Sequence, residues 1–153
     1  MASLFDNADS QYYQVDSAAV TAAPLTMVCW MRVDDLLGNQ VFGNLWLGDA
    51  SATTQFWRLR VNTQTDFLVA RIRGSGNIEW NAGTNSITVD TWHHVGIRDV
   101  SATDHDIILD GTTTNNTTSA VPNSAVIDRM AIGHFGDTTP SNPWSGDLAE
   151  MAM

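Results

Sequence analysis

Two short stretches of this sequence alternate arginine with apolar residues. Successive side chains of a β-strand point to opposite faces, so the arginines of each stretch would share one face. If the stretches pair through the connection 63–66, four of the seven arginines line one sheet surface: Arg58, Arg60, Arg71 and Arg73. Four guanidinium groups on a chain of net charge −10 predict a site that holds carboxylate or sulfate through paired hydrogen bonds. The alternative is a solvated face whose arginines pair with loop aspartates.

The same parity adds a carboxylate, because Glu79 in the stretch 77–81 would join the arginine surface. Sugar binding usually also needs an aromatic side chain that stacks on the apolar face of the ring. Trp46, beside a Gly-Asp pair, and Trp144, in a proline-flanked loop, are expected to be exposed and are the candidates. Two other tryptophans fall on the apolar parity and are expected in the core: Trp57 and Trp80.

Hydrolysis of a glycosidic bond usually requires two carboxylates that face one sugar. Neither Glu79 nor Glu150 is followed by an acidic residue at strand spacing. The acidic triplet 104–106 is interpreted as a solvated turn without a partner nucleophile. The sequence therefore predicts a binding protein and no enzyme, with no catalytic residue.

A histidine metal site is not predicted, because the adjacent His93 and His94 would point to opposite faces of a strand. His105 and His134 stand apart in the sequence. Cys29 is the only cysteine, so the chain has neither zinc-binding spacing nor an intrachain disulfide. Its apolar neighbours predict a buried thiol.

The acidity of the chain limits the classes of partner that it is expected to bind. Phosphate neutralisation needs a basic surface, so a pI near 4.4 argues against nucleic acid and against anionic lipid. The sequence shows neither a signal peptide nor an apolar run of membrane-spanning length, so membrane insertion is not expected and a cytoplasmic or an extracellular location remains open.

Short apolar or alternating runs, bounded by Gly, Asn, Asp, Ser or Pro, predict an all-β domain over residues 1–153. The predicted strands are 12–15, 25–33, 40–47, 55–62, 67–73, 77–81, 92–100, 105–109, 125–133 and 147–153. About ten short strands with regular turns are typical of a sandwich or barrel. Asp110-Gly111 predicts a tight turn, and the polar stretch 112–123 a surface loop.

Four landmarks occur in an order that resembles the laminin-G-like, concanavalin A-like jelly-roll superfamily of lectins and glucanases. They are 5–9 with 12–15, 25–32, 92–98 with 107–111, and 130–134 with 144–150. The resemblance implies an antiparallel two-sheet jelly-roll sandwich with a convex and a concave face. Members of the superfamily that hydrolyse glucans carry a Glu-x-Asp motif on one strand, and this sequence has none.

The resemblance also implies a structural calcium near the chain ends, for which Asp6 and Asp147 are the matching ligands; the alternative is that they are surface aspartates that bind nothing, and no other cofactor is expected. The sequence departs from the pattern at Ala149, where the family often has Asp, and it stops at Met153, where a short tail usually follows. The expected function is a lectin-like module that binds a glycan or another anionic surface ligand. The alternatives are a degenerate glycoside hydrolase and a structural or adhesion subunit of a surface or virion-like assembly.

Overall fold

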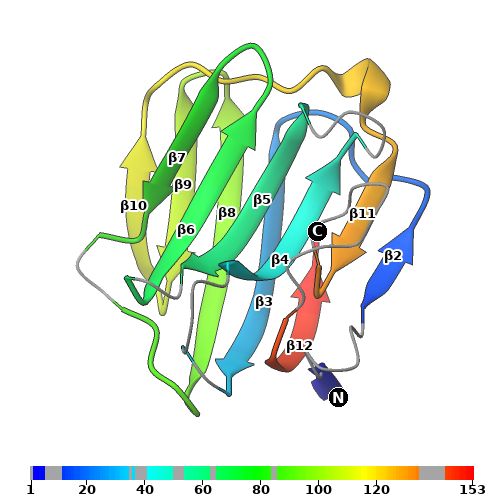
Figure 1. Ribbon diagram of the computed structural model, residues 1–153. Helices are drawn as coiled ribbons and strands as arrows, with labels where there is room; N and C mark the ends of the chain where they lie inside the picture. Colours follow the sequence, from blue (N-terminus) through cyan, green and yellow to red (C-terminus); the bar gives the residue numbers. More distant parts are fainter. Residues whose placement is uncertain are drawn as a thin grey trace.

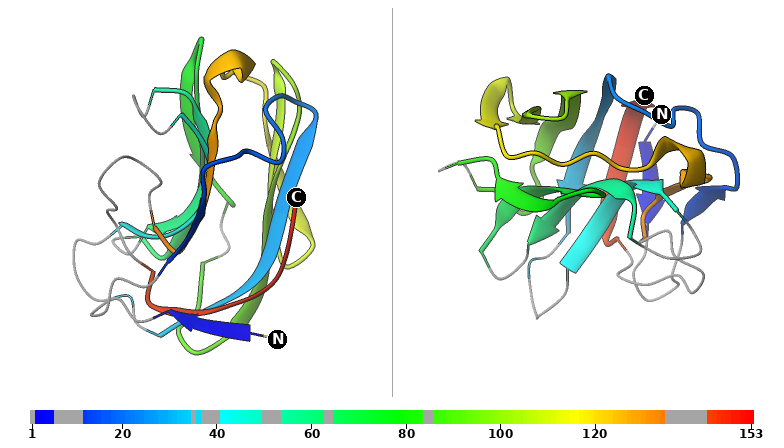
Figure 2. Two further views of the ribbon diagram at one scale, coloured as in Figure 1. Left: turned by 90° about the vertical axis from the view of Figure 1, so that its right-hand side faces the viewer. Right: turned by 90° about the horizontal axis from the view of Figure 1, so that it is seen from above.

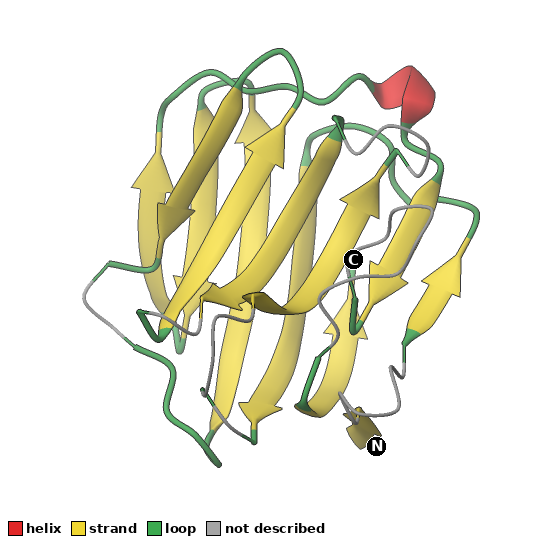
Figure 3. Ribbon diagram, viewed as in Figure 1, coloured by secondary structure: helices red, strands yellow, loops and turns green. Residues whose placement is uncertain are grey.

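The computed structural model describes residues 2–5, 12–34, 36, 41–49, 54–62, 65–83, 86–134 and 144–153. Two antiparallel sheets of six strands pack face to face (Figures 1 and 3). The first sheet has the order β1 (Ala2–Phe5), β12 (Gly146–Ala152), β3 (Leu25–Val33), β8 (Trp92–Ser101), β9 (Asp104–Leu109), β10 (Thr112–Asn116). The second has the order β2 (Tyr13–Val15), β11 (Arg129–Ile132), β4 (Val41–Gly48), β5 (Phe56–Asn62), β6 (Phe67–Arg73), β7 (Asn77–Asn81).

The order of the strands is that of a jelly roll, because each sheet combines consecutive strands with neighbours that come from distant parts of the chain. β1 pairs with β12, and β12 pairs with β3. Both sheets bend in the same direction, so the outer face of the second sheet is concave and that of the first is convex (Figure 2). The short 3-10 helix Ser124–Val126 is capped by the Asn123 side chain. No helix in the described part of the chain is long and apolar enough to span a membrane.

The core lies between the sheets and is built by strand alternation. In β3 every second residue is buried, from Leu25 through Cys29 to Val33. The facing strand β5 contributes Trp57 and Leu59 to the same cluster. Each such apolar side chain stabilises the fold by roughly 1.5–3 kcal/mol when it leaves water. The alternation therefore fixes which side chains of each strand face outward.

The predicted two-sheet fold is confirmed, and β3, β6 and β7 have the predicted bounds. Two strands were not predicted, β1 and β10. The expectation that residues 112–116 belong to a loop is wrong: they form β10, which pairs with β9 through the tight turn predicted at Asp110-Gly111. Both turn residues have positive φ, 49° and 80°, as a two-residue hairpin loop of type I′ requires.

Candidate functional site

Strand register brings the predicted arginines together on the outer face of the second sheet. Arg58 of β5 is directly opposite Arg71 of β6, and Arg71 is opposite Glu79 of β7. The intervening residues Trp57 and Leu59 point into the core, as predicted. We call Arg58, Arg60, Arg71 and Arg73 the arginine face. It lies on the concave side of the sandwich (Figure 2).

One carboxylate links three of these arginines. The Oε1 atom of Glu79 accepts a hydrogen bond of 2.9 Å from Nη2 of Arg60. Its Oε2 atom lies 3.8 Å from Nε of Arg71 and 3.9 Å from Nη2 of Arg58. Nε of Arg71 also donates to Oδ1 of Asn77 at 3.0 Å. Glu79 is therefore shared among three guanidinium groups.

Arg58 and Arg60 are not solvated, although they point away from the core. Only 6% and 8% of their surfaces are exposed. The guanidinium carbons of Arg58 and Arg71 lie 5.6 and 5.8 Å from the centroid of the Phe56 ring, within cation–π range. For these two residues the expectation of solvation is wrong. The outer face of this sheet also carries its own buried cluster of Trp46, Phe56 and Ala131.

Positive charge is crowded at this face. Burial, and then the charges of Arg60 and Arg71, lower the pKa of Arg58 to about 9, while Glu79 acts in the opposite direction. The Nε and Nη1 atoms of Arg60 are buried and have no hydrogen-bond partner among the described residues. Buried donors without acceptors are costly, so an added anion would find both charge and donors here.

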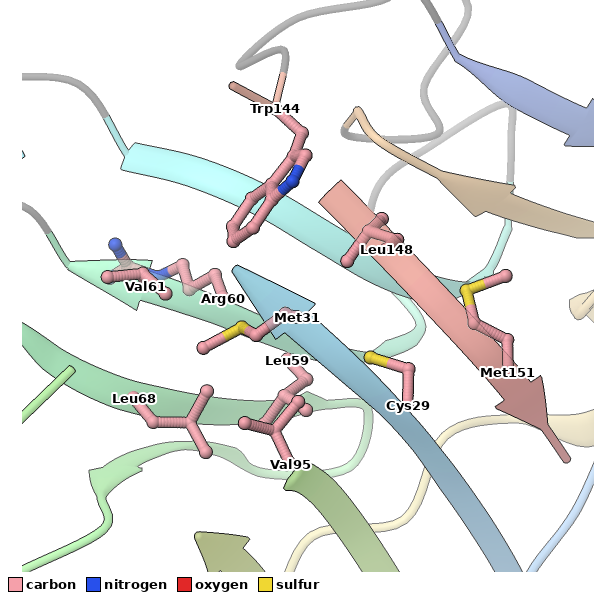
Figure 4. Close-up of a pocket in the computed structure, with 10 residues that line it drawn as sticks. All are labelled: Cys29, Met31, Leu59, Arg60, Val61, Leu68, Val95, Trp144, Leu148 and Met151. Carbon is pink, nitrogen blue, oxygen red and sulfur yellow. The ribbon is translucent and has the colours of Figure 1, made fainter. Parts of the chain in front are cut away.

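The two tryptophans expected to be exposed are buried, and that expectation is wrong. Trp46 is 0% exposed because its outward ring packs with Phe56 and Ala131. Trp144 is 1% exposed, and its ring lies between the sheets beside a small cavity of about 20 Å³ (Figure 4). Loop position predicted exposure, but packing across the sandwich overrides it. Trp57 is in the core and Trp80 packs against it, as predicted.

The acidic triplet 104–106 is not a turn but the start of β9, so that interpretation is also wrong. His105 is fully buried, and its Nδ1 lies 2.7 Å from Oδ1 of Asp99. Its Nε2 faces the carbonyl oxygens of Ala102 and Thr118, both at 3.1 Å. Nε1 of Trp57 donates to Oδ2 of the same Asp99. We call Asp99, His105 and Trp57 the buried triad; it joins the two sheets.

The adjacent histidines of β8 point to opposite faces, as predicted. Nε2 of His93 accepts from the backbone N–H of Thr88 at 3.0 Å, and its Nδ1 lies 2.7 Å from Oδ2 of Asp110. Both nitrogens of the ring are thus used. His94 contacts Trp30 instead, on the other face. Among the described residues, no group of three or more His, Cys, Asp or Glu side chains is placed to hold a metal ion.

The predicted calcium ligands are only partly visible. Asp6 lies outside the described residues. Oδ2 of Asp147 accepts a hydrogen bond of 2.8 Å from Nε of Arg32, which raises the pKa of Arg32. A guanidinium group on this oxygen does not suit a calcium ligand. Cys29 is buried as predicted, and burial raises its thiol pKa to about 12.

Sequence reasoning missed two exposed tryptophans on the outer face of the first sheet, Trp30 and Trp92. Parity within 25–33 carries the signal for Trp30: residues on either side of it are buried, so Trp30 must point outward.

The sequence matches the family model of the concanavalin A-like lectin/glucanase superfamily over residues 6–153. The chain belongs to this superfamily. Among solved structures, this superfamily member resembles a NanB sialidase mutant of Streptococcus pneumoniae (TM-score 0.76, 12% identity) over 98% of its own length and 25% of that chain. It resembles the CBM40 module of the Ruminococcus gnavus IT-sialidase (TM-score 0.65, 11% identity) over 93% of its length and 90% of that chain.

Domains LG4-5 of the mouse laminin α1 chain are also similar (TM-score 0.74, 11% identity), with coverage of 98% of this chain and 40% of that one. The chain thus spans about a quarter of the length of the pneumococcal sialidase and less than half of the laminin fragment. A search of curated proteins gave no match. At these identities the structural likeness concerns the fold.

Proposed function

We propose that this domain is a non-catalytic glycan-binding module whose arginine face binds an acidic sugar. The observation that carries the proposal is the sharing of one carboxylate, Glu79, by the guanidinium groups of Arg58, Arg60 and Arg71. A sugar carboxylate or sulfate would add a second anionic acceptor beside Glu79. The superfamily fold supports the proposal, since the similar CBM40 module is described bound to α2,3-sialyllactose, an acidic glycan.

Local geometry would have to overcome the net charge of −10, which repels an anion at long range. Short charge-assisted hydrogen bonds can do this, because each contributes on the order of 1.5–3 kcal/mol where water is excluded. The contribution is smaller at exposed positions. Arg58 and Arg60 are buried, whereas Arg71 is more open, so we expect the ligand to enter beside Arg71 and Glu79.

A binding role fits this face better than hydrolysis does. A glycosidase would need a second carboxylate roughly 5–10 Å from the first. Among the residues in register with the arginine face, Glu79 is the one carboxylate. We therefore expect no new reducing ends when the protein is incubated with the glycans that it binds.

The test is calorimetric titration with sialylated, uronic-acid and sulfated glycans, each beside its neutral counterpart, for example sialyllactose beside lactose. We expect binding of an acidic member only. The double variant Arg58→Lys/Arg71→Lys keeps the charge but loses the planar fork, so affinity should fall about tenfold or more.

Arg98→Lys is the matched control, because Arg98 pairs with Asp106 on the outer face of the other sheet. This variant should bind like the wild type. Unchanged affinity in the double variant, or no binding of any acidic glycan by the wild type, would contradict the proposal.

A further inference from the structure

The convex outer face of the first sheet carries two exposed tryptophans that the arginine face does not involve. Trp30 on β3 and Trp92 on β8 expose 39% and 40% of their surfaces. They lie on adjacent strands, since Trp30 is opposite His94 and Trp92 is opposite Arg32. Large aromatic side chains that share an exposed area often mark a binding surface.

These tryptophans line a surface hollow of about 300 Å³ together with Ala149 and Glu150 of β12. Ala149 is directly opposite Trp30, and its small side chain leaves the space beside the indole open. On the other side of Trp30, the ring of His94 lies 5.3 Å away, centroid to centroid, and supports it. The hollow therefore has aromatic walls and a gap at Ala149.

Backbone distortion brings a carboxylate to the hollow. The register of β12 against β3 shifts between Ala149 and Ala152, so Glu150 lies at a bulge. Glu150 also has a φ of +50°, which is uncommon for a residue with a side chain. Bulges redirect side chains, and strained backbone is typical of binding sites.

The surroundings of the hollow are acidic. Arg32, opposite Trp92, is already engaged by Asp147, Asp90 and Asp34, at 2.5, 3.4 and 3.5 Å. Three carboxylates thus surround one guanidinium group, and Glu150 adds a fourth carboxylate to the same face. This charge favours a cationic occupant and disfavours the acidic sugars that would suit the arginine face.

We propose that this hollow binds a methylated ammonium group. Such a cation is attracted to the electron-rich face of indole rings, and Glu150 supplies the counter-charge. It has few or no N–H groups to satisfy, which fits a hollow that is lined by two indole rings, Ala149 and a single carboxylate, that of Glu150. A sugar ring would bring several hydroxyl groups that this lining does not match. The site is independent of the proposed glycan function, because it lies on the opposite face and takes the opposite charge.

The decisive comparison uses choline and 3,3-dimethyl-1-butanol, its neutral isostere. Saturation-transfer NMR on the methyl signal should show saturable binding of choline and at least tenfold weaker binding of the neutral compound. Trp30→Leu should abolish the choline signal, and Glu150→Gln should weaken binding several-fold. Ala149→Leu fills the gap beside Trp30 and should block the site without removing either attractive group.

Arg71→Lys, on the arginine face, is the control and should leave choline binding unchanged. Thermal melting monitors folding, so loss of the signal in a folded Ala149→Leu protein supports the site even if Trp30→Leu does not fold. Co-sedimentation with phosphatidylcholine vesicles distinguishes a lipid headgroup from a soluble ligand. Equal binding of the neutral isostere, binding of glucose in place of choline, or full binding by folded Ala149→Leu would overturn the proposal.

Discussion

Between the sheets, the carboxylate of Asp99 is held by Trp57 and His105, whereas on the concave face the carboxylate of Glu79 is shared by three arginines. Both clusters remove charge from water. In the buried triad each oxygen of Asp99 has a donor, and each nitrogen of His105 faces an acceptor. On the arginine face, two nitrogens of Arg60 have no acceptor among the described residues.

The difference separates a structural role from a binding role. A fully satisfied polar network fixes one arrangement of its side chains, and loss of any member is costly. A cluster with more donors than acceptors is costly as it stands and gains when an anion arrives. We therefore expect changes in the triad to affect stability, and changes at the arginine face to affect anion binding.

The largest effect is expected for Asp99→Ala. This change leaves His105 and the indole N–H of Trp57 buried without their shared acceptor. Each buried donor that is left without an acceptor typically costs about 1–3 kcal/mol, so the loss of both contacts should lower the free energy of unfolding by about 3–5 kcal/mol. Chemical denaturation measures the free energy of unfolding. Asp16→Ala is the control, because Asp16 makes an exposed pair with Arg129 that contributes about 1 kcal/mol or less. Equal losses of free energy of unfolding in both variants would contradict the distinction between the buried contacts of Asp99 and the exposed pair of Asp16.

The rate of Cys29 labelling is a second measure of the stability that Asp99→Ala loses. Burial raises the pKa of this thiol to about 12, so at neutral pH it is protonated, inaccessible and expected to react only after opening of the fold. In Asp99→Ala, a loss of about 3–5 kcal/mol in free energy of unfolding would speed labelling by a thiol reagent about a hundred- to several-thousand-fold, since about 1.4 kcal/mol corresponds to tenfold. The Arg71→Lys variant should label at the wild-type rate. Rapid labelling of the native wild type would show that Cys29 is accessible.

The pH dependence of anion binding probes the crowded charge directly. With the pKa of Arg58 lowered to about 9, its guanidinium group is charged at neutral pH and loses its proton as the pH rises through that value. An anion favours the protonated form, so affinity should be constant from pH 7 to 8 and fall by up to about tenfold per pH unit above 9. Calorimetry over this range measures it. Arg58→Met should bind more weakly and lack the decline.

Glu79→Gln is expected to give a smaller, opposite effect. Removal of the shared carboxylate removes an acceptor that competes with an external anion for three guanidinium groups, so sulfate affinity should rise several-fold. Without sulfate the variant should lose about 1 kcal/mol or less, because Glu79 is 40% exposed. Melting in sulfate and in chloride at equal ionic strength separates specific binding from screening. Asp16→Asn should show no sulfate-specific gain.

The smallest effect concerns calcium, which stays a prediction for Asp6 and Asp147. Bound calcium would raise the melting temperature with its occupancy, but Asp147 would first have to release Arg32. Melting with calcium and with chelator measures the difference. Identical melting curves would contradict the prediction that calcium binds in this part of the fold.

Much of the arginine face could be predicted because strand parity is local. The period of two assigns Arg58 and Arg60 to one side of β5 and Trp57 to the other, whatever the rest of the fold does. Parity cannot say what covers the outer side. The burial of Arg58, Arg60 and Trp46 depends on contacts across strands and on a second apolar cluster, which no single stretch reveals.

The buried triad shows the same limit of sequence-based prediction, here for a polar stretch that is buried. A polar triplet at 104–106 has the composition of a turn, yet it forms the start of β9. There Asp99 and the carbonyl oxygens of Ala102 and Thr118 face the ring nitrogens of His105. These partners come from both sides of His105 in the chain. Composition predicts solvation, whereas the assembled network determines burial.

The position of β12 affects how the chain can fold as it leaves the ribosome. This last strand lies between β1 and β3, which are made first. Until residues 146–152 emerge, one edge of β3 lacks β12 and β1 lacks the strand with which it pairs, so the first sheet stays incomplete until then. Pairing between such distant segments is slow, and open strand edges invite association with other chains. A nascent chain of this protein should therefore depend on chaperones until residues 146–152 have emerged and paired.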